Sequence, residues 1–149
     1  MSTIKKFLNL IFIDGLSGMA LGLFSTLIIG TILKQAADLI GGDFGYYLGV
    51  FAVMAQRLTG AGIGIGVAYK YKSSTYVTLS AAAAGMIGAY ATAIISGSIL
   101  SDGALVYSGP GDPLSAFIAA LAGIAVGSLP AGKTKLDLLI TPAVTIIAG

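Results

Sequence analysis

Residues 46–71 constrain the fold more than any other part of the sequence. Between Asp43 and Lys70 the only charged residue is Arg57, which lies near the middle of this apolar segment. A continuous helix here would be about 39 Å long, enough to cross a hydrocarbon core of about 30 Å with tilt. The sequence therefore predicts a transmembrane helix with an arginine near the bilayer midplane. Such an arginine needs a partner, a water-filled cavity or a functional reason to be there.

The composition is that of an integral membrane protein. Hydrophobic residues make up 56% of the chain and charged residues 9%, with a mean hydropathy of +0.97, whereas charged residues make up about 25% of a soluble domain. The absence of cysteine, histidine, tryptophan and glutamate excludes disulfides, thiol chemistry and histidine acid–base catalysis, and most transition-metal sites. We therefore expect no enzymatic activity, no cofactor and no metal.

Uncharged runs separated by short polar connections predict an all-α fold, a polytopic transmembrane helix bundle with four full spans and a partial fifth. The predicted spans are residues 7–33, 44–69, 76–100 and 113–129. The last apolar block, residues 138–149, is too short to cross a bilayer as one helix. It is either re-entrant or the start of a cut fifth helix, and we favour the second. Residues 1–149 are thus expected to form a single transmembrane domain, the N-terminal part of a longer one.

Basic residues are concentrated at alternate connections, which predicts the orientation of the chain. The connections after the first and third predicted spans are less basic: the first of them contains Lys34, and the other contains no basic residue. The positive-inside rule then places the N-terminus in the cytoplasm, and the basic clusters face an anionic leaflet rather than nucleic acid. These clusters are Lys5 with Lys6, Lys70 with Lys72, and Lys133 with Lys135.

Glycines at helical spacing predict close packing between helices, because small residues let two backbones approach. Residues 60–66 alternate glycine with apolar residues, a pattern that also suits a strand. A strand in lipid would leave backbone groups unsatisfied, so a helix is favoured. The expected packing residues are Gly18, Gly22, Gly60, Gly62, Gly64, Gly66, Gly123 and Gly127.

Arg57 is the strongest candidate for a functional residue. In a functional role, Arg57 would bind an anion or compensate charge in a permeation pathway. In a structural role, it would bond to backbone carbonyls at a helix break. The sequence does not separate these two roles. Gln56 and Thr59 extend the polar patch, although Gln56 and Arg57 cannot face the same partner on a regular helix.

Asp14 is the only carboxylate within reach of the predicted membrane region. It is a candidate proton or cation site, but a role as an N-terminal helix cap ahead of Gly15 is the favoured interpretation. We do not expect Asp14 to pair with Arg57, because the two lie at different depths.

Three stretches resemble a known family. They are Phe7-Leu8-Asn9 with residues 18–23, Ala55-Gln56 with the glycine-rich run to Ala68, and residues 134–145, TKLDLLITPAVT. These stretches resemble the membrane domain of the phosphotransferase-system IIC-like family, which includes perfringolysin-regulator-like proteins. The resemblance implies a multi-pass protein of the bacterial inner membrane, similar to sugar-translocating IIC components. It also implies a homo-oligomer, with a dimer favoured, and cytoplasmic phosphocarrier partners.

The expected function is therefore alternating-access transport of a small molecule, a sugar, as part of a IIC-like permease. The chain departs from the family pattern because sugar-transporting members rely on glutamate and histidine near the sugar, and it contains neither. Family members are also considerably longer. Two alternatives remain open: a non-transporting membrane regulator or sensor with the same fold, and a small oligomeric pore.

Overall fold

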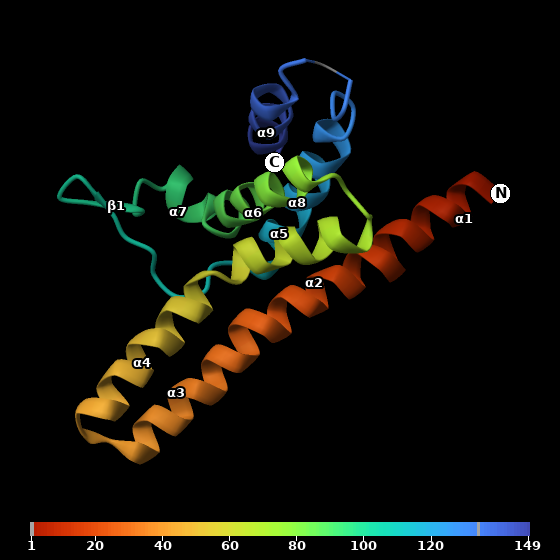
Figure 1. The fold of residues 1–149 in the computed structure, drawn as a ribbon. Coiled ribbons are helices and arrows are strands. Elements are labelled where there is room, and N and C mark those ends of the chain that lie inside the picture. The colour runs from red at the N-terminus through yellow and green to blue at the C-terminus, as the bar shows by residue number, and fades with distance from the viewer. Residues whose placement is uncertain (1, 134) are drawn as a thin grey trace.

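The computed structural model describes residues 2–133 and 135–149, and nearly all of its regular structure is helical (Figure 1). Met1 and Thr134, the first residue of the third family-like stretch, lie outside the described residues. The chain opens with one helix over Ser2–Ile40. It consists of α1 (Ser2–Asn9), α2 (Leu16–Leu23) and α3 (Ile29–Ile40), joined by π-helical turns at Leu10–Gly15 and Phe24–Ile28.

The first helix is longer than predicted. The expected end at residue 33 is wrong, because the chain stays helical through Lys34. The helix ends at Ile40, and Gly41, whose φ is 65°, follows it. No glycine or proline interrupts residues 31–40, and Lys34 and Asp38 lie at exposed positions where a polar side chain does not disfavour a helix. At 39 residues the helix is about 58 Å long.

The predicted continuous second helix is also wrong, because it is broken at its centre. α4 (Gly42–Arg57) and α5 (Thr59–Lys70) are bent by 52° at Leu58. The two halves have different partners: α4 contacts α3, whereas α5 contacts α2, α6 and α8. A straight helix could not follow α3 and cross the other helices as well, and the bend resolves this conflict.

Glycines let α5 approach its neighbours at backbone distance. A Cβ at Gly18 would lie 2.6 Å from the carbonyl oxygen of Gly66, and one at Gly22 would overlap the backbone of Gly62. α5 meets α6 (Thr75–Ala89) in the same way. There a Cβ at Gly60 would lie 2.6 Å from the carbonyl oxygen of Gly85.

The third predicted helix, residues 76–100, is too long. α6 ends at Ala89, Tyr90 has non-helical dihedral angles, and only the short α7 (Ala91–Ile95) follows. Strands β1 (Leu100–Ser101) and β2 (Ala104–Leu105) then form an antiparallel hairpin. Its two turn residues, 102 and 103, both have positive φ, which suits a two-residue hairpin turn.

The last two helices pack against each other and against α6. α8 (Pro113–Gly127) and α9 (Asp137–Ala148) meet where a Cβ at Gly123 would lie 2.7 Å from the carbonyl oxygen of Thr145. A Cβ at Gly127 would overlap the Thr145 side chain. Thr145 is fully buried, and its hydroxyl donates to the Thr141 carbonyl over 2.8 Å.

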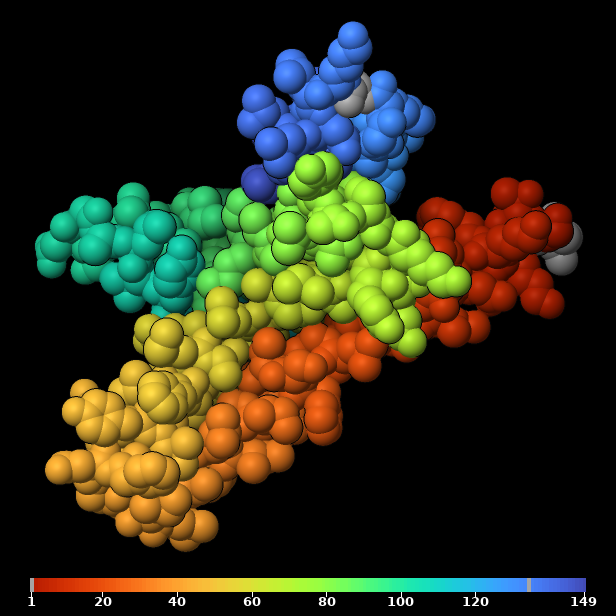
Figure 2. All heavy atoms as spheres, viewed as in Figure 1, coloured from red at the N-terminus to blue at the C-terminus, as the bar shows by residue number. Residues whose placement is uncertain are grey.

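The molecule has two regions, a core and an arm, which differ in how much of their surface is covered by other helices. The core consists of α2, α5, α6 and α8, and Ile63, Val67 and Val77 in it are fully buried. The arm is the hairpin formed by α3 and α4, residues 29–57, and it projects away from the core (Figures 1 and 2). The N-terminal α1 projects at another edge of the molecule (Figure 2).

The helices differ in whether they are long enough to cross a membrane. The helix Ser2–Ile40 is long and apolar enough to cross a membrane by itself. The bent pair α4–α5 is long and apolar enough only if the two helices are taken together as one span. α6, α8 and α9 are apolar but have 15, 15 and 12 residues, fewer than the ~20 that a straight span needs. The nearly all-α fold is as predicted, and four full spans plus a partial fifth stay a prediction.

Candidate functional site

The break between α4 and α5 is the centre of the candidate site. Leu58 has φ −85° and ψ 8°, and its N–H bonds three residues back to the Ala55 carbonyl over 3.2 Å. A helix end leaves backbone carbonyls without helical partners. Thr59, which is fully buried, satisfies one of them, because its hydroxyl donates to the Gln56 carbonyl over 2.6 Å.

Polar side chains tie the break to the first helix. The Gln56 side-chain amide donates to the Thr31 hydroxyl over 3.0 Å, and that hydroxyl donates to the Leu27 carbonyl over 2.7 Å. Thr26, in the second π-helical turn, places its hydroxyl 3.4 Å from that of Thr59. Wide π turns are frequent at functional sites, and here one lies beside the helix break.

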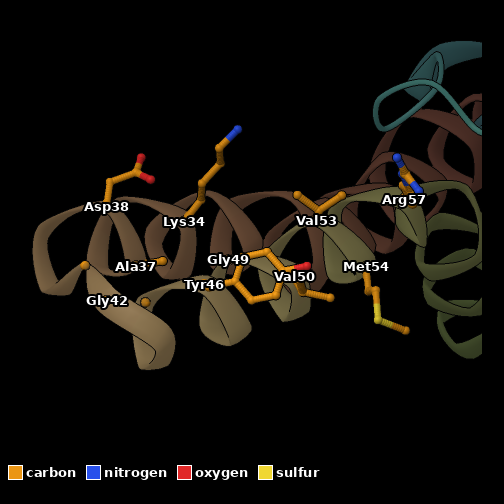
Figure 3. Close-up of a pocket in the computed structure, with 12 residues that line it drawn as sticks. Lys34, Ala37, Asp38, Gly42, Tyr46, Gly49, Val50, Val53, Met54 and Arg57 are labelled. Atoms are coloured by element: carbon orange, nitrogen blue, oxygen red, sulfur yellow. The ribbon is translucent and has the colours of Figure 1, made fainter.

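Arg57 lies at the break and also lines an open groove. It is exposed and occupies the last turn of α4, where a cation interacts favourably with the negative end of the helix dipole. The groove, about 620 Å³, runs along the arm, and its polar lining residues include Lys34, Asp38 and Tyr46. In Figure 3, Asp38 and Arg57 lie at opposite ends of the labelled residues, with Lys34 between them.

A second break lies next to the first. The Tyr90 hydroxyl, between α6 and α7, donates to the Gly109 carbonyl over 2.6 Å and lies 3.5 Å from the Arg57 carbonyl oxygen. Asp112 anchors the end of the same loop, since its N–H donates to the Ala89 carbonyl over 2.7 Å. The ends of α4 and α6 and the loop before α8 therefore converge.

The structure brings together three of the four candidate polar residues. Gln56, Arg57 and Thr59 surround the break, with Gln56 directed toward α3 and Arg57 lining the groove. Asp14 is elsewhere: it is exposed, lies inside the first helix in the turn Leu10–Gly15, and does not cap a helix. The capping interpretation is therefore wrong, because the helix begins before Asp14.

Asp14 and Arg57 lie near opposite ends of α5. Asp14 is close enough to Tyr71, which follows α5, for its negative charge to raise the pKa of that hydroxyl, after the larger effect of burial. Arg57 precedes α5, a helix of 12 residues and so about 18 Å long.

The sequence reasoning missed several residues of the site. A signal was available for Thr26 and Thr31, which are polar side chains in an otherwise apolar run. Lys34 and Asp38 fall in the predicted connection after the first span, and no sequence signal marks Tyr90. Among residues 2–133 and 135–149, no cluster of three or more carboxylate, histidine or cysteine side chains is placed to hold a metal.

The comparison with protein families decides the identity of the chain. Residues 13–149 match the family model described as "Phosphotransferase system, EIIC". The chain belongs to this EIIC family. The resemblance seen in the sequence is thereby confirmed, and the chain is a membrane component of the phosphotransferase system. Searches of curated proteins and of solved structures each found no match to this EIIC chain.

Proposed function

We propose that this EIIC chain forms the membrane-embedded part of a sugar permease of the phosphoenolpyruvate-dependent phosphotransferase system, working by alternating access. The observation that carries the proposal is the helix break at Leu58, in a chain whose family consists of transport components. Discontinuous helices build substrate sites in many transporters, because the ends of half-helices offer backbone groups to the ligand. This chain would do no covalent chemistry.

The groove beside the break has groups suited to a polyhydroxy ligand. Sugar hydroxyls both donate and accept hydrogen bonds, and Asp38 can only accept while Lys34 and Arg57 can only donate. Tyr46 adds an aromatic ring to the same lining. We propose that these four side chains, with Gln56 and Thr59 supporting the break, contribute to the sugar pathway.

The proposal includes a topology and partners. Four full spans plus a partial fifth in the bacterial inner membrane, with a cytoplasmic N-terminus, are supported by the alternating basic clusters of the sequence. In Figure 1 the α3–α4 turn and β1 lie toward the side opposite the N-terminus, which is consistent with this orientation. A homodimer and cytoplasmic phosphocarrier proteins complete the proposed system.

The deciding experiment is uptake of radiolabelled hexoses, hexitols and disaccharides by cells that express the full-length protein, with and without the phosphocarrier proteins. We expect uptake of one class of sugar that depends on the carriers. Arg57→Gln should lower it roughly tenfold or more, the effect of losing a charge-assisted contact, and Arg57→Lys should lower it less. Lys133→Gln, which removes the same charge outside the groove, is the matched control.

Two outcomes would redirect the proposal. Sugar binding to the purified protein without uptake would favour a regulator or sensor. Leak of sugars from proteoliposomes without any carrier protein would favour an oligomeric pore. In either case the permease interpretation would be abandoned.

A further inference from the structure

An apolar groove lies between the N-terminal helix and α8, away from the helix break. Its volume is about 340 Å³, and it is lined by Phe7, Leu10 and Ile11 on one side and by α8 residues including Leu121 and Ala125 on the other. Tyr71 completes the lining, and its hydroxyl donates to the Leu10 carbonyl over 2.9 Å. Burial and the nearby Asp14 raise the pKa of this hydroxyl, which keeps it protonated.

The lining suits a hydrocarbon chain better than a peptide. A peptide segment carries backbone N–H and C=O groups that must find hydrogen-bond partners when they are buried. Tyr71 is the polar side chain of this lining, and its proton is already committed to the first helix. An acyl chain has no such requirement.

Three exposed lysines lie close in the sequence to residues that line the groove. Lys70 and Lys72 flank Tyr71 on both sides in the sequence, and both are exposed. Lys6, also exposed, lies one helical turn before Leu10 on the same face of the helix. The opposing charge is Asp14, which lies near Tyr71. The three lysines outnumber this carboxylate, so we expect the end of the groove near Tyr71 to favour an anion.

We propose that this groove holds one acyl chain of an anionic phospholipid whose phosphate is bound by Lys70, Lys72 and Lys6. An apolar groove with a basic end matches both parts of such a lipid, and basic pockets at the cytoplasmic ends of membrane helices are suited to anionic headgroups. The site is distinct from the break at Leu58 and does not depend on sugar transport. A bound lipid would join the N-terminal helix to α8.

The test uses native mass spectrometry of the full-length protein titrated with phosphatidylglycerol or phosphatidylcholine. The unmodified protein should retain phosphatidylglycerol preferentially. Lys72→Gln should weaken that binding roughly fivefold, the effect expected for one lysine at an anionic surface, and Asp14→Asn should strengthen it. Lys34→Gln is the charge-matched control, because residue 34 lies 24 positions from Leu10 on the same helix, about 36 Å away.

A second variant separates a seated acyl chain from attraction at the surface. Ala125→Phe fills the groove without changing any charge, and it should reduce phosphatidylglycerol binding by at least as much as Lys72→Gln. Equal melting temperatures of all variants in phosphatidylcholine nanodiscs would show that each one folds.

Three results would overturn the proposal. Unchanged binding in Ala125→Phe would mean that no acyl chain occupies the groove. Equal retention of the two lipids would remove the role of the lysines. A dimer that dissociates in Ala125→Phe, without a change in bound lipid, would show that a second copy of the chain covers the groove.

Discussion

The arm and the core use the same device, a small residue at a helix contact, with different results. In the arm, a Cβ at Gly45 would lie 2.6 Å from the Ala37 carbonyl oxygen, yet the outer faces of α3 and α4 stay uncovered, with Phe44 68% and Phe51 61% exposed. In the core, α5 has neighbours on several sides, and Ile63 is fully buried. The number of partners, rather than the glycine pattern, decides which region becomes a protein interior and which keeps an exposed apolar surface.

The largest effect is expected from adding a methyl group within the core. A Cβ at Gly64 would overlap the Ala81 carbonyl of α6, so Gly64→Ala should lower the free energy of unfolding by about 1–3 kcal/mol or more. The matched change in the arm is Gly49→Ala, where the new Cβ would lie 3.7 Å from the Ala37 Cβ, an ordinary contact. It should be neutral or stabilise by up to about 1 kcal/mol through helix propensity.

Unfolding of both variants by sodium dodecyl sulfate, followed by circular dichroism, measures this difference. Equal changes in the two midpoints would contradict the difference in packing between Gly64 in the core and Gly49 in the arm.

A local effect of about 1 kcal/mol is expected for Gly45→Ala, because the methyl group would push α4 away from the Ala37 carbonyl. The arm has a free end at the turn between its helices, so it can splay apart without disturbing α5. Hydrogen exchange should therefore accelerate for amides of α3 and α4 and stay unchanged for those of α5 and α6. Faster exchange throughout the chain would show that the two regions unfold as one unit.

A smaller effect is expected where the arm meets the core. Thr31→Val removes the hydroxyl that accepts from the Gln56 amide, and Gln56→Leu removes the donor. A double-mutant cycle should give a coupling of about 0.5–1 kcal/mol, at the low end for a hydrogen bond because the site is partly exposed. Ser25→Ala is the control, since that hydroxyl bonds within its own helix to Leu21. A coupling near zero would show that the hydrogen bond between Gln56 and Thr31 does not stabilise the contact between arm and core.

The smallest effect is a pH dependence at the N-terminus of α8. Hydrogen bonds from the Ser115 side chain, and then from the N–H groups of Leu114 and Ser115, hold the pKa of Asp112 below its ordinary value. A lowered folded-state pKa gives stability that is present above the unfolded pKa and lost as the pH falls through the folded pKa. Unfolding midpoints from about pH 7 to about pH 3 should show this loss in the unmodified protein.

Asp112→Asn, which keeps a capping oxygen but does not ionise in this range, should flatten that part of the curve. An unchanged curve in this variant would assign the pH dependence to another carboxylate.

Much of the fold could be predicted because each region carried its own signal. The apolar runs and the spacing of the glycines are local features of the sequence, and the apolar runs predicted the nearly all-α fold. The boundaries at residues 33 and 100 were wrong for different reasons. Lys34 sits on an exposed face where a helix can continue, whereas the third helix stops at Tyr90, whose hydroxyl bonds to Gly109 far along the chain. The contact between Tyr90 and Gly109 could not be found from a local pattern.

The sequence by itself determined that this is a helical membrane protein of the EIIC family, and it predicted a special environment for Arg57. Hydropathy, charge and motif are properties of the residues, so they can be read without coordinates. Only the tertiary structure placed Arg57 beside a helix break, because the bend at Leu58 arises from the different partners of α4 and α5. The same packing placed Arg57 in a groove with Lys34 and Asp38, and left Asp14 near the other end of α5 beside Tyr71.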